Sequence, residues 1–310
     1  MPREGPGVPV SDGVATIGRG GDSRTGYPRA ERWQTATVLA ELADVAGVVL
    51  SDAGRCRGGQ IGASYVRWPD GHMSVLTARP PGQLAEARRM ERLTAAGRAA
   101  GVPAPRYELI AELQSVTAIV QELLPGTAPL TISRQVVTDM VDVNQRCRGL
   151  LADRAESPAP SLYLLTDGPG FCLHGAMASY DKQTARLLDA IHEIGASEPD
   201  CLAGIDLVHF DFHPENVLVA TSGRISGVVD WDGANRSDAT FDLFTLRFTL
   251  ARTAPELGHW VGGLLSETAA PHVLRACWAH MSLRLVDWSI RELTAADVSA
   301  WAAVAADLMP

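Results

Sequence analysis

Two patterns of apolar and polar residues follow one another along this chain. Between about residues 50 and 123, short apolar runs alternate with glycines and turn residues, which predicts strands. Beyond about residue 130, apolar residues recur every three or four positions, which predicts helices. The expected strands are 73–78 and 116–123, and the expected helices are 31–45, 83–100, 181–194, 240–252, 259–265, 273–291 and 297–308. The chain is therefore predicted to be an α+β protein, β-rich at first and mainly helical afterwards.

The length of the chain favours two hydrophobic cores over one. At 310 residues, with 46% hydrophobic and 20% charged residues, the chain is long for one compact core. Two lobes that share one site are predicted, and the turn at Pro125 and Gly126 separates a first lobe of residues 31–126 from a second lobe of residues 127–310. Residues 1–30, rich in Gly, Pro and Arg, are expected to form a flexible leader.

Composition narrows where the protein works and what it binds. No apolar run reaches the roughly 18 residues of a membrane helix, and the N-terminus lacks the basic start and apolar core of a secretory signal. The five cysteines form no C-x-x-C pair, so reduced thiols and a cytoplasmic location are expected. The net charge of -9 disfavours a nucleic-acid partner, because binding a phosphate backbone usually needs a basic face. It weakly favours a cationic substrate, although an acidic balance that keeps a protein soluble explains it equally well.

The candidate chemistry lies in residues 207–232, LVHFDFHPENVLVATSGRISGVVDWD. Polar residues here follow closely on apolar runs, and two β-rich runs at 216–220 and 225–229 predict a hairpin. The hairpin would bring Asp211 and Asp230 to the same end of neighbouring strands. Carboxylates far apart in sequence could then face one bound ion.

The spacing within this stretch indicates phosphoryl transfer. His209-x-Asp211 followed by Asn216 has the spacing of the catalytic loop H-x-D-x-x-x-x-N, and Asp230 stands where a second, metal-binding acid is expected. A carboxylate at Asp211 can orient an acceptor hydroxyl and take its proton. Asn216 and Asp230 offer the oxygen ligands that Mg²⁺ prefers on nucleotide phosphates.

Parts of the pattern are compatible with other metal sites. His209 and His213 are four residues apart and could, with Asp211, belong to a metallohydrolase, but Pro214 blocks the helix that such a pair usually needs. The acidic run D-W-D at 230–232 could by itself be a glycosyltransferase-like metal motif. The remainder of the stretch favours phosphoryl transfer over both.

Neighbouring residues are expected to support this site. His209 is expected to support the loop through its imidazole, and His213 to lie behind the reacting groups or face the substrate. Trp231 is expected to pack beside the metal-binding acid, and Asp232 to be either a second metal ligand or part of the phosphate site. Asp242 is expected to accept backbone hydrogen bonds that tie the catalytic loop together.

Taken further along the chain, the sequence resembles the aminoglycoside phosphotransferase and choline kinase family, which has a bilobal protein-kinase-like fold. Residues 207–216 resemble its Brenner-type motif, and D-A-T-F-D-L at 238–243 resembles its G-D-P-x-x-D-L element, with alanine in place of proline. G-G-Q-I-G-A-S-Y-V at 58–66 resembles its nucleotide-covering loop, and E-L-L-P-G at 122–126 resembles its hinge. The resemblance covers about residues 50–250.

The resemblance implies transfer of the γ-phosphoryl group of ATP or GTP, with Mg²⁺, to a hydroxyl of a small molecule. Asp211 would be the catalytic base, and Asn216 and Asp230 would hold the metal. The residues that it implies for nucleotide binding are Gly59, Gly62, Ala63, Ser64, Arg79, Glu86, Glu122 and Leu124.

One position departs from the family pattern. The family usually has a lysine, sometimes an arginine, on the third strand, where it holds the phosphates and pairs with a helix carboxylate, here Glu86. The strand S-V-L-T-A-R at 74–79 has no lysine: Thr77 fills the aligned position, while Arg79 has the same strand parity and the required charge. Arg79 is therefore predicted to contact the phosphates. If neither residue does so, the chain would be a weak or inactive kinase.

The resemblance also implies that the acceptor is an antibiotic, so that phosphorylation would give resistance. Aminoglycosides, tuberactinomycin peptides and nucleoside antibiotics are all compatible acceptors, and the rival hypotheses are a metabolic kinase for an amino alcohol or sugar and a nucleotide-binding pseudokinase. The run A-P-E at 254–256 matches a protein-kinase signature, but the residues before it are an apolar-periodic helix, so no peptide-binding platform is expected. Trp278 and Trp288 are expected to be packing residues.

Overall fold

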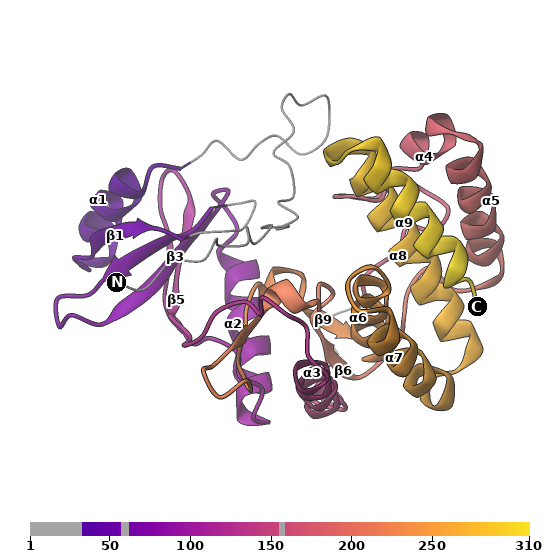
Figure 1. Ribbon diagram of the computed structural model, residues 1–310. Helices are drawn as coiled ribbons and strands as arrows, with labels where there is room; N and C mark the ends of the chain where they lie inside the picture. The colour runs from indigo at the N-terminus through magenta and orange to yellow at the C-terminus, as the bar shows by residue number, and fades with distance from the viewer. Residues whose placement is uncertain (1–32, 57–61, 155–158) are drawn as a thin grey trace, which may run out of the picture.

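The computed structural model describes residues 33–56, 62–154 and 159–310. A β-sheet lies at one end of the molecule and most of the helices lie at the other, with α2 (Leu84–Ala99), which follows β3 in sequence, between them in space (Figure 1). The expected leader and Gly59 lie outside the described residues. The predicted order, strands first and helices afterwards, is confirmed.

The first part of the chain forms a five-stranded antiparallel sheet in the order β1-β2-β3-β5-β4. The strands are β1 (Ser51–Arg55), β2 (Ser64–Arg67), β3 (Met73–Arg79), β4 (Tyr107–Glu112) and β5 (Thr117–Glu122). Burial alternates along β3, so Leu76 and Ala78 face one side of the sheet while Thr77 and Arg79 face the other. The strands expected at 73–78 and 116–123 are both present.

Helix α1 (Thr35–Ala46) covers one face of this sheet (Figure 1). Its buried Val38 and Leu42 pack with Val66, Leu76 and Val120 in a small core of their own. The apolar residues at helical spacing therefore pack on the first lobe, as the sequence predicted.

Helix α2 packs against the other side and belongs to two clusters. Its Ala87 packs against Ile110 and Ile119 of the sheet, whereas Met90 and Leu93 are part of the large core formed with the helical part of the chain. One helix thus joins the sheet to the helices by continuous apolar packing. The lobe boundary at residue 126 stays a prediction.

The connection after β5 approaches the helical part closely. Thr127 N donates to Val219 O over 3.2 Å, and Val219 N donates to Thr127 O over 2.8 Å. Gly126 has a φ of 109°, and a Cβ there would lie 2.5 Å from Ser226 Oγ and 2.8 Å from the Val219 carbonyl oxygen. Only glycine fits such a close approach. The predicted turn therefore allows the connection to contact Val219 and Ser226 of the second lobe.

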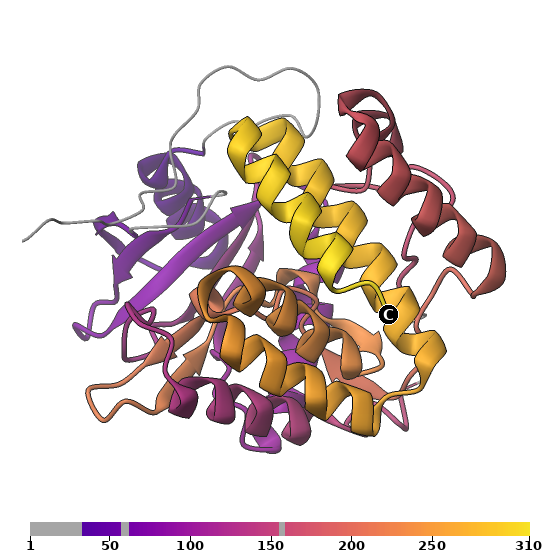
Figure 2. The same ribbon diagram turned by 45° about the vertical axis from the view of Figure 1, so that its right-hand side comes forward.

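The second part of the chain is mainly helical. Its helices are α3 (Arg134–Cys147), α4 (His174–Tyr180), α5 (Lys182–Ser197), α6 (Thr240–Thr253), α7 (Pro255–Thr268), α8 (Pro271–Glu292) and α9 (Ala295–Asp307). Helix α8 lies at the centre, in contact with α4, α5, α6 and α9, and α9 runs along it (Figure 2). Trp278 of α8 is fully buried, and its Nε1 donates to Ala305 O over 2.7 Å, which confirms its expected packing role.

The A-P-E sequence is the start of a helix. Pro255 is the first residue of α7, where a missing N–H costs nothing because the first amides of a helix have no intrahelical acceptor. The residues before it form α6, as the sequence predicted.

Two short antiparallel sheets carry the candidate chemistry. Strand β6 (Asp206–Val208) pairs with β9 (Asn235–Ser237), and β7 (Val217–Val219) pairs with β8 (Ile225–Val228). The predicted hairpin is the second of these pairs. Two single 3₁₀ turns lie beside the acidic residues: η1 (Pro214–Asn216) begins three residues after Asp211, and η2 (Trp231–Gly233) begins directly after Asp230.

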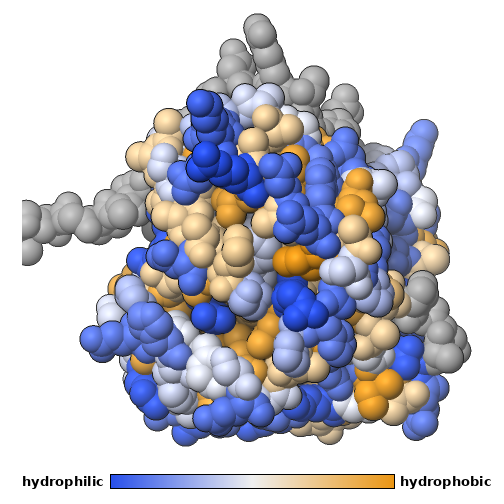
Figure 3. Space-filling model, turned by 90° about the vertical axis from the view of Figure 1, so that its right-hand side faces the viewer, coloured by the Kyte–Doolittle hydropathy of each residue, from blue (hydrophilic) through white to orange (hydrophobic). Residues whose placement is uncertain are grey.

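Within the described part of the chain, no helix has the length and apolar character needed to cross a membrane. All five cysteines are free thiols, as expected. Polar and apolar residues are interspersed over the helical end of the molecule, seen from the right-hand side of Figure 1 (Figure 3).

Candidate active site

The loop that carries Asp211 is held in place by a buried carboxylate. Asp242 of α6 accepts hydrogen bonds from the backbone amides of His209 and Phe210, over 2.8 and 2.9 Å. Phe210 adopts a left-handed conformation, with a φ of 65°, and these bonds stabilise the turn. Burial raises the pKa of Asp242 to about 7, although both backbone bonds act in the opposite direction. Asp242 thus accepts the backbone hydrogen bonds expected of it, and its support of a catalytic loop stays a prediction.

His209 is a structural residue. Its buried ring lies with Nε2 2.9 Å from Val229 O and with Nδ1 accepting a hydrogen bond from Asp211 N over 3.3 Å. Such a pair of contacts suits the neutral imidazole, and burial lowers the pKa of His209 to about 4. Its ring also packs against Trp231, 4.7 Å away between ring centroids. These contacts agree with the expectation that His209 supports the loop, which stays a prediction.

Asp211 lies between two elements that hold different oxygens of its carboxylate. Asn216 Nδ2 donates to Asp211 Oδ2 over 3.1 Å and to the Asp211 carbonyl oxygen over 2.9 Å. His213 Nε2 lies 3.4 Å from the same Oδ2. On the other side, Arg284 Nη2 donates to Asp211 Oδ1 over 2.8 Å. The base, the amide and His213 predicted from the sequence are therefore brought together.

These neighbours keep Asp211 ionised. Burial alone would raise the pKa of Asp211, but the hydrogen bond from His213 and the positive charge of Arg284 hold it below its usual range. His213 itself is positioned by Glu215, whose backbone amide donates to His213 Nδ1 over 3.3 Å. His213 thus lies behind the carboxylate, which is one of the two places expected for it.

Arg284 was not singled out by the sequence pattern. It stands in α8, a helix whose residues are mostly buried, and it continues a polar stripe with His280, Asp287 and Arg291 at spacings of four, three and four. That stripe on an otherwise apolar helix was the available signal. Its meaning depends on which element α8 packs against, and the sequence does not state that.

Asp230 follows β8 at the start of η2. It has a φ of 62° and lies near the end of the catalytic loop, because Val229 N donates to Asn216 O over 2.9 Å. Burial, together with the negative charges of Asp232 and Asp211, raises the pKa of Asp230 to about 6. A buried carboxylate beside two others is an electrostatically unfavourable arrangement that a bound cation would relieve.

Asp232 forms an ion pair with Arg79 of β3. Of the two roles expected for Asp232, the pair favours a place in the phosphate site. The Arg79 side chain is 15% exposed, and its Nε is buried without a hydrogen-bond partner among the described residues. Thr77 lies two residues before Arg79 and faces the same side of β3.

Glu86 does not pair with the third strand, contrary to the expectation from the family pattern. Its carboxylate accepts hydrogen bonds from Arg89, one turn along α2, over 2.7 and 2.9 Å. Arg89 also donates to Asn235 Oδ1 of β9 over 3.3 Å. The local arginine, three residues away on the same helix, satisfies Glu86 because residues at that spacing are neighbours on a helix surface.

The segment expected to cover the nucleotide is described only from residue 62. Gly62 has a φ of 87°, which suits the predicted close turn, and Ala63 O accepts a hydrogen bond from Cys56 N over 2.9 Å. Ser64 is buried, and its hydroxyl lies 2.8 Å from Thr35 Oγ1 of α1. Its side chain therefore faces α1, on the far side of the sheet from Arg79, and only its backbone remains available to a nucleotide.

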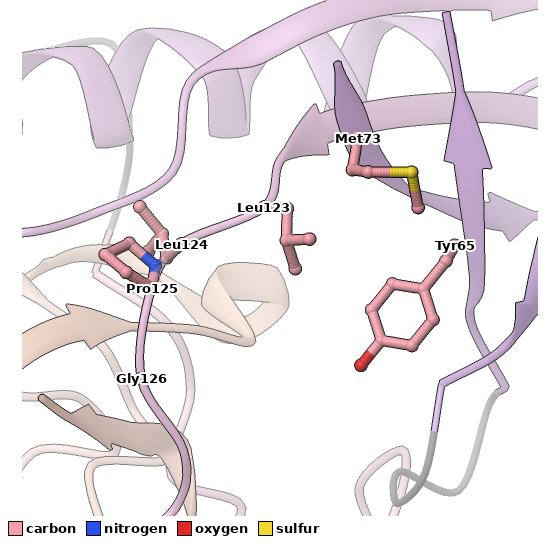
Figure 4. A pocket seen from close by; sticks show the side chains of 6 residues that line it. All are labelled: Tyr65, Met73, Leu123, Leu124, Pro125 and Gly126. Atoms are coloured by element: carbon pink, nitrogen blue, oxygen red, sulfur yellow. The ribbon is translucent and has the colours of Figure 1, made fainter. Parts of the chain in front are cut away.

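A cavity of about 490 Å³ lies between the sheet and the connection after β5. Tyr65 and Met73 line one side of it, and residues 123–126 line the other (Figure 4). Leu124 therefore lines the cavity, and its predicted contact with a nucleotide stays a prediction. The Glu122 carboxylate instead accepts a hydrogen bond from the backbone amide of Arg106 over 3.1 Å, and it also pairs with the Arg106 guanidinium.

No group of three or more His, Cys, Asp or Glu residues close enough to hold a metal ion occurs in the described residues. Both ring nitrogens of His209 already have partners, Val229 O and Asp211 N, so the ring does not offer a free nitrogen to a metal. The carboxylates and the amide at Asp211, Asn216 and Asp230 are an oxygen donor set, which suits Mg²⁺ rather than zinc.

Comparison with known proteins defines the class. The sequence profile of the phosphotransferase enzyme family, APH, matches residues 52–277. The chain therefore belongs to this phosphotransferase family and is a small-molecule kinase, the class predicted from its sequence. No curated protein sequence matches it.

Solved structures of similar fold include enzymes with several acceptors. A thermostable mutant of aminoglycoside phosphotransferase APH(4)-Ia, in complex with ADP and hygromycin B, is 19% identical, covers 88% of this chain and 97% of its own, and has a TM-score of 0.65. Macrolide 2'-phosphotransferase MphH from Brachybacterium faecium is 22% identical, with coverage of 86% and 97% and a TM-score of 0.51. A Thermobifida fusca protein assigned by name as a fructosamine-3-kinase is 16% identical, with coverage of 89% and 99% and a TM-score of 0.57. The predicted bilobal, kinase-like fold is confirmed.

Proposed function

We propose that this enzyme transfers the γ-phosphoryl group of ATP or GTP to a hydroxyl of an antibiotic, with Mg²⁺ as the metal. One observation carries the proposal: Asn216 Nδ2 donates to the Asp211 carboxylate, while Asp230 lies at the end of the adjoining strand. This arrangement supports the proposal of a proton acceptor beside an oxygen donor set for a metal. Both are what phosphoryl transfer to an alcohol needs.

In this proposal, Asp211 is the base. Its ionised carboxylate would accept the proton of the acceptor hydroxyl while that oxygen bonds to the γ-phosphorus and the bond to the leaving oxygen of ADP or GDP breaks. The transition state of such a transfer is loose, so positioning and charge neutralisation matter more than strong basicity. A carboxylate with a lowered pKa, held by Asn216, His213 and Arg284, suits that task.

The residues fit a magnesium ion. Asn216 uses its Nδ2 for Asp211, which leaves the amide oxygen as its ligand atom. The raised pKa of Asp230 reflects a concentration of negative charge that a divalent cation would offset. Asn216 and Asp230 would therefore hold Mg²⁺, and the bound ion would neutralise charge on the nucleotide phosphates.

The nucleotide would lie between the cavity and Arg79. The base of the nucleotide would enter the space lined by Tyr65, Met73 and Leu124, whose apolar side chains suit a flat ring. Its phosphates would reach Arg79, whose partner Asp232 lies on the same side of the cleft as Asp230. ATP is the donor that we favour, because the APH(4)-Ia structure contains ADP. The cytoplasm, which supplies the nucleotide, remains the predicted location.

An antibiotic acceptor is favoured by the neighbours of similar fold, because two aminoglycoside phosphotransferases are in complex with hygromycin B and with streptomycin, and a third neighbour is a macrolide 2'-phosphotransferase. The fructosamine-3-kinase neighbour supports a metabolic acceptor as the second candidate. The two candidates require different acceptors and share the same machinery.

The deciding experiment offers MgATP and MgGTP with a panel of hydroxylated acceptors and measures the mass gain of one phosphoryl group. The panel contains hygromycin B, streptomycin, a macrolide, capreomycin, a nucleoside antibiotic and a fructosamine. Phosphorylation of an antibiotic supports the first candidate, and phosphorylation of the fructosamine alone supports the second. Tight nucleotide binding without transfer to any acceptor would identify a pseudokinase and refute the proposed function.

A further inference from the structure

Arg284, from a distant part of the chain, donates two hydrogen bonds to the catalytic loop. Its guanidinium spans two adjacent residues, with Nη1 donating to Phe210 O over 2.6 Å and Nη2 donating to Asp211 Oδ1 over 2.8 Å. The Arg284 side chain is 27% exposed, so it is only partly accessible to solvent. This planar, two-point contact is one that a guanidinium can make and an ammonium cannot reproduce.

The neighbours of Arg284 on α8 have other partners. His280 Nδ1 lies 2.8 Å from Leu162 O, Asp287 accepts a hydrogen bond from Leu173 N over 2.8 Å, and Arg291 Nη2 donates to Gly170 O over 2.6 Å. These three hold the segment between α3 and α4 against α8. Within the described residues, Arg284 is the member of this stripe that reaches the catalytic loop.

The contacts of Asp211 divide between its two oxygens. Asn216 Nδ2 and His213 Nε2, both from the loop itself, lie 3.1 and 3.4 Å from Oδ2. Arg284 Nη2, which comes from α8, lies 2.8 Å from Oδ1. Rotation of the carboxylate about its Cβ–Cγ bond would break contacts on both sides. The bond from Arg284 is the shortest of the three and is charge-assisted, so it contributes most to the orientation of the group.

We propose that Arg284 is a positioning residue for phosphoryl transfer, which holds the Asp211 carboxylate in the orientation that receives the acceptor hydroxyl. The proposal rests on the proposed function, in which Asp211 is the base. An arginine stays protonated, so Arg284 does not exchange the proton itself. It acts through Asp211 and through the carbonyl of Phe210, the left-handed residue that immediately precedes Asp211.

This role predicts a change in turnover more than in nucleotide affinity. We expect Arg284→Met to lower kcat for MgATP by about 10- to 100-fold, because a small displacement of a catalytic group costs about that much, while KM for ATP changes little. Arg284→Lys keeps the charge and loses the two-point contact, so its kcat is expected to lie between that of the wild type and that of Arg284→Met. The readout is ADP release, with the acceptor that the panel identifies and with water alone.

The matched control is Arg275→Met, an arginine of the same helix. Arg275 pairs with Glu198 at the start of the segment after α5, and it touches neither the loop nor the cavity residues. Its kcat should equal that of the wild type. Thermal unfolding of all variants separates a loss of positioning from a loss of folded protein.

The decisive comparison is made in the Asp211→Asn background. If Arg284 acts through the carboxylate, adding Arg284→Met to Asp211→Asn lowers the residual rate by less than about twofold. A full additional loss in that background, or a wild-type kcat in the single variant Arg284→Met, overturns the inference. Failure of the proposed function has a different signature, because the wild type itself then releases no ADP from MgATP with any acceptor or with water.

Discussion

The catalytic loop and strand β3 use charged residues in opposite ways. Asp211 of the loop accepts hydrogen bonds from Asn216 and from Arg284 of α8, and Asp242 of α6 accepts them from two backbone amides of the loop. On β3, Arg79 has a single ion-pair partner, Asp232, whose side chain is 45% exposed, and Arg79 Nε has no partner among the described residues.

The difference indicates which half of the site is already organised. A group held from several directions keeps its geometry without ligand, which is what a catalytic base needs. A single, partly exposed ion pair contributes little stability and can exchange its partner at low cost. We therefore expect the loop to be preorganised and the phosphate side to rearrange when a nucleotide enters, with Arg79 moving from Asp232 to a phosphate oxygen.

The largest expected effect is on the preorganised side. Asp211→Asn removes the proton acceptor and preserves the shape of the side chain, so kcat should fall by about 10²- to 10⁴-fold, the usual contribution of a positioned base. ATP affinity, measured by calorimetry, should stay within about twofold of the wild type because Asp211 is not placed against the nucleotide base. The control is Asp189→Asn, an exposed aspartate of α5, which should leave turnover unchanged. A near-normal rate in Asp211→Asn would remove Asp211 as the base.

The next effect concerns the phosphate side. Arg79→Met should raise KM for ATP by about tenfold or more, because a hydrogen bond to a charged group contributes roughly 1.5 to 3 kcal/mol. Steady-state kinetics with ATP as the varied substrate measures this change. Arg88→Met, on the exposed side of α2, is the control and should not alter KM. If Arg79→Met and Arg88→Met behave alike, the phosphate contact lies elsewhere and Thr77 becomes the candidate.

A third effect follows from the buried histidine of the loop. The pKa of His209 is about 4 in the folded protein and about 6.5 when unfolded, so between these values the unfolded chain binds more protons. The contribution of His209 to stability therefore falls as the pH decreases from 6.5 towards 4, by roughly 2 kcal/mol at pH 5. Asp242 and Asp230, with raised pKa values of about 7 and about 6, act in the opposite direction over part of this range.

Because these contributions oppose one another, the test compares variants rather than reading the wild type alone. His209→Gln should lose less stability than the wild type between pH 7.5 and pH 5, measured from thermal or urea unfolding at both values. His72→Gln, at an exposed histidine of the turn before β3, should follow the wild type. Parallel curves for His209→Gln and the wild type would show that the loop does not carry this pH dependence.

The smallest effect is expected at Glu86. In the family pattern its carboxylate would pair with the third-strand cation, but here it pairs with Arg89 on its own helix. Glu86→Gln should therefore change KM for ATP by about threefold at most, as for an exposed pair at helical spacing. A rise in KM for ATP as large as that of Arg79→Met would mean that Glu86 takes Arg79 as its partner in the nucleotide complex. The phosphate side would then resemble the loop, because its charged residues would also have more than one partner.

Much of this molecule was predictable because its local patterns are strong. The alternation along β3 and the helical spacing of α8 are set by neighbouring residues, so their boundaries follow from the sequence closely. The same holds for Asp211, Asn216 and Asp242, whose spacing reflects a loop with a specific hydrogen-bond pattern. Glu86 was predicted wrongly because two partners compete for one carboxylate, and the nearer one on the helix prevails.

The sequence by itself determined the order of strands and helices, the hairpin that brings Asp211 near Asp230, and the chemistry of their side chains, because these depend on residues close together in the chain. Only the tertiary structure decided which distant groups share those side chains: Arg284 with Asp211 and Arg79 with Asp232, from residues 73 and 153 positions apart. Such pairs depend on how α8 and β3 pack against the loop, and packing is decided by the whole core rather than by any local pattern.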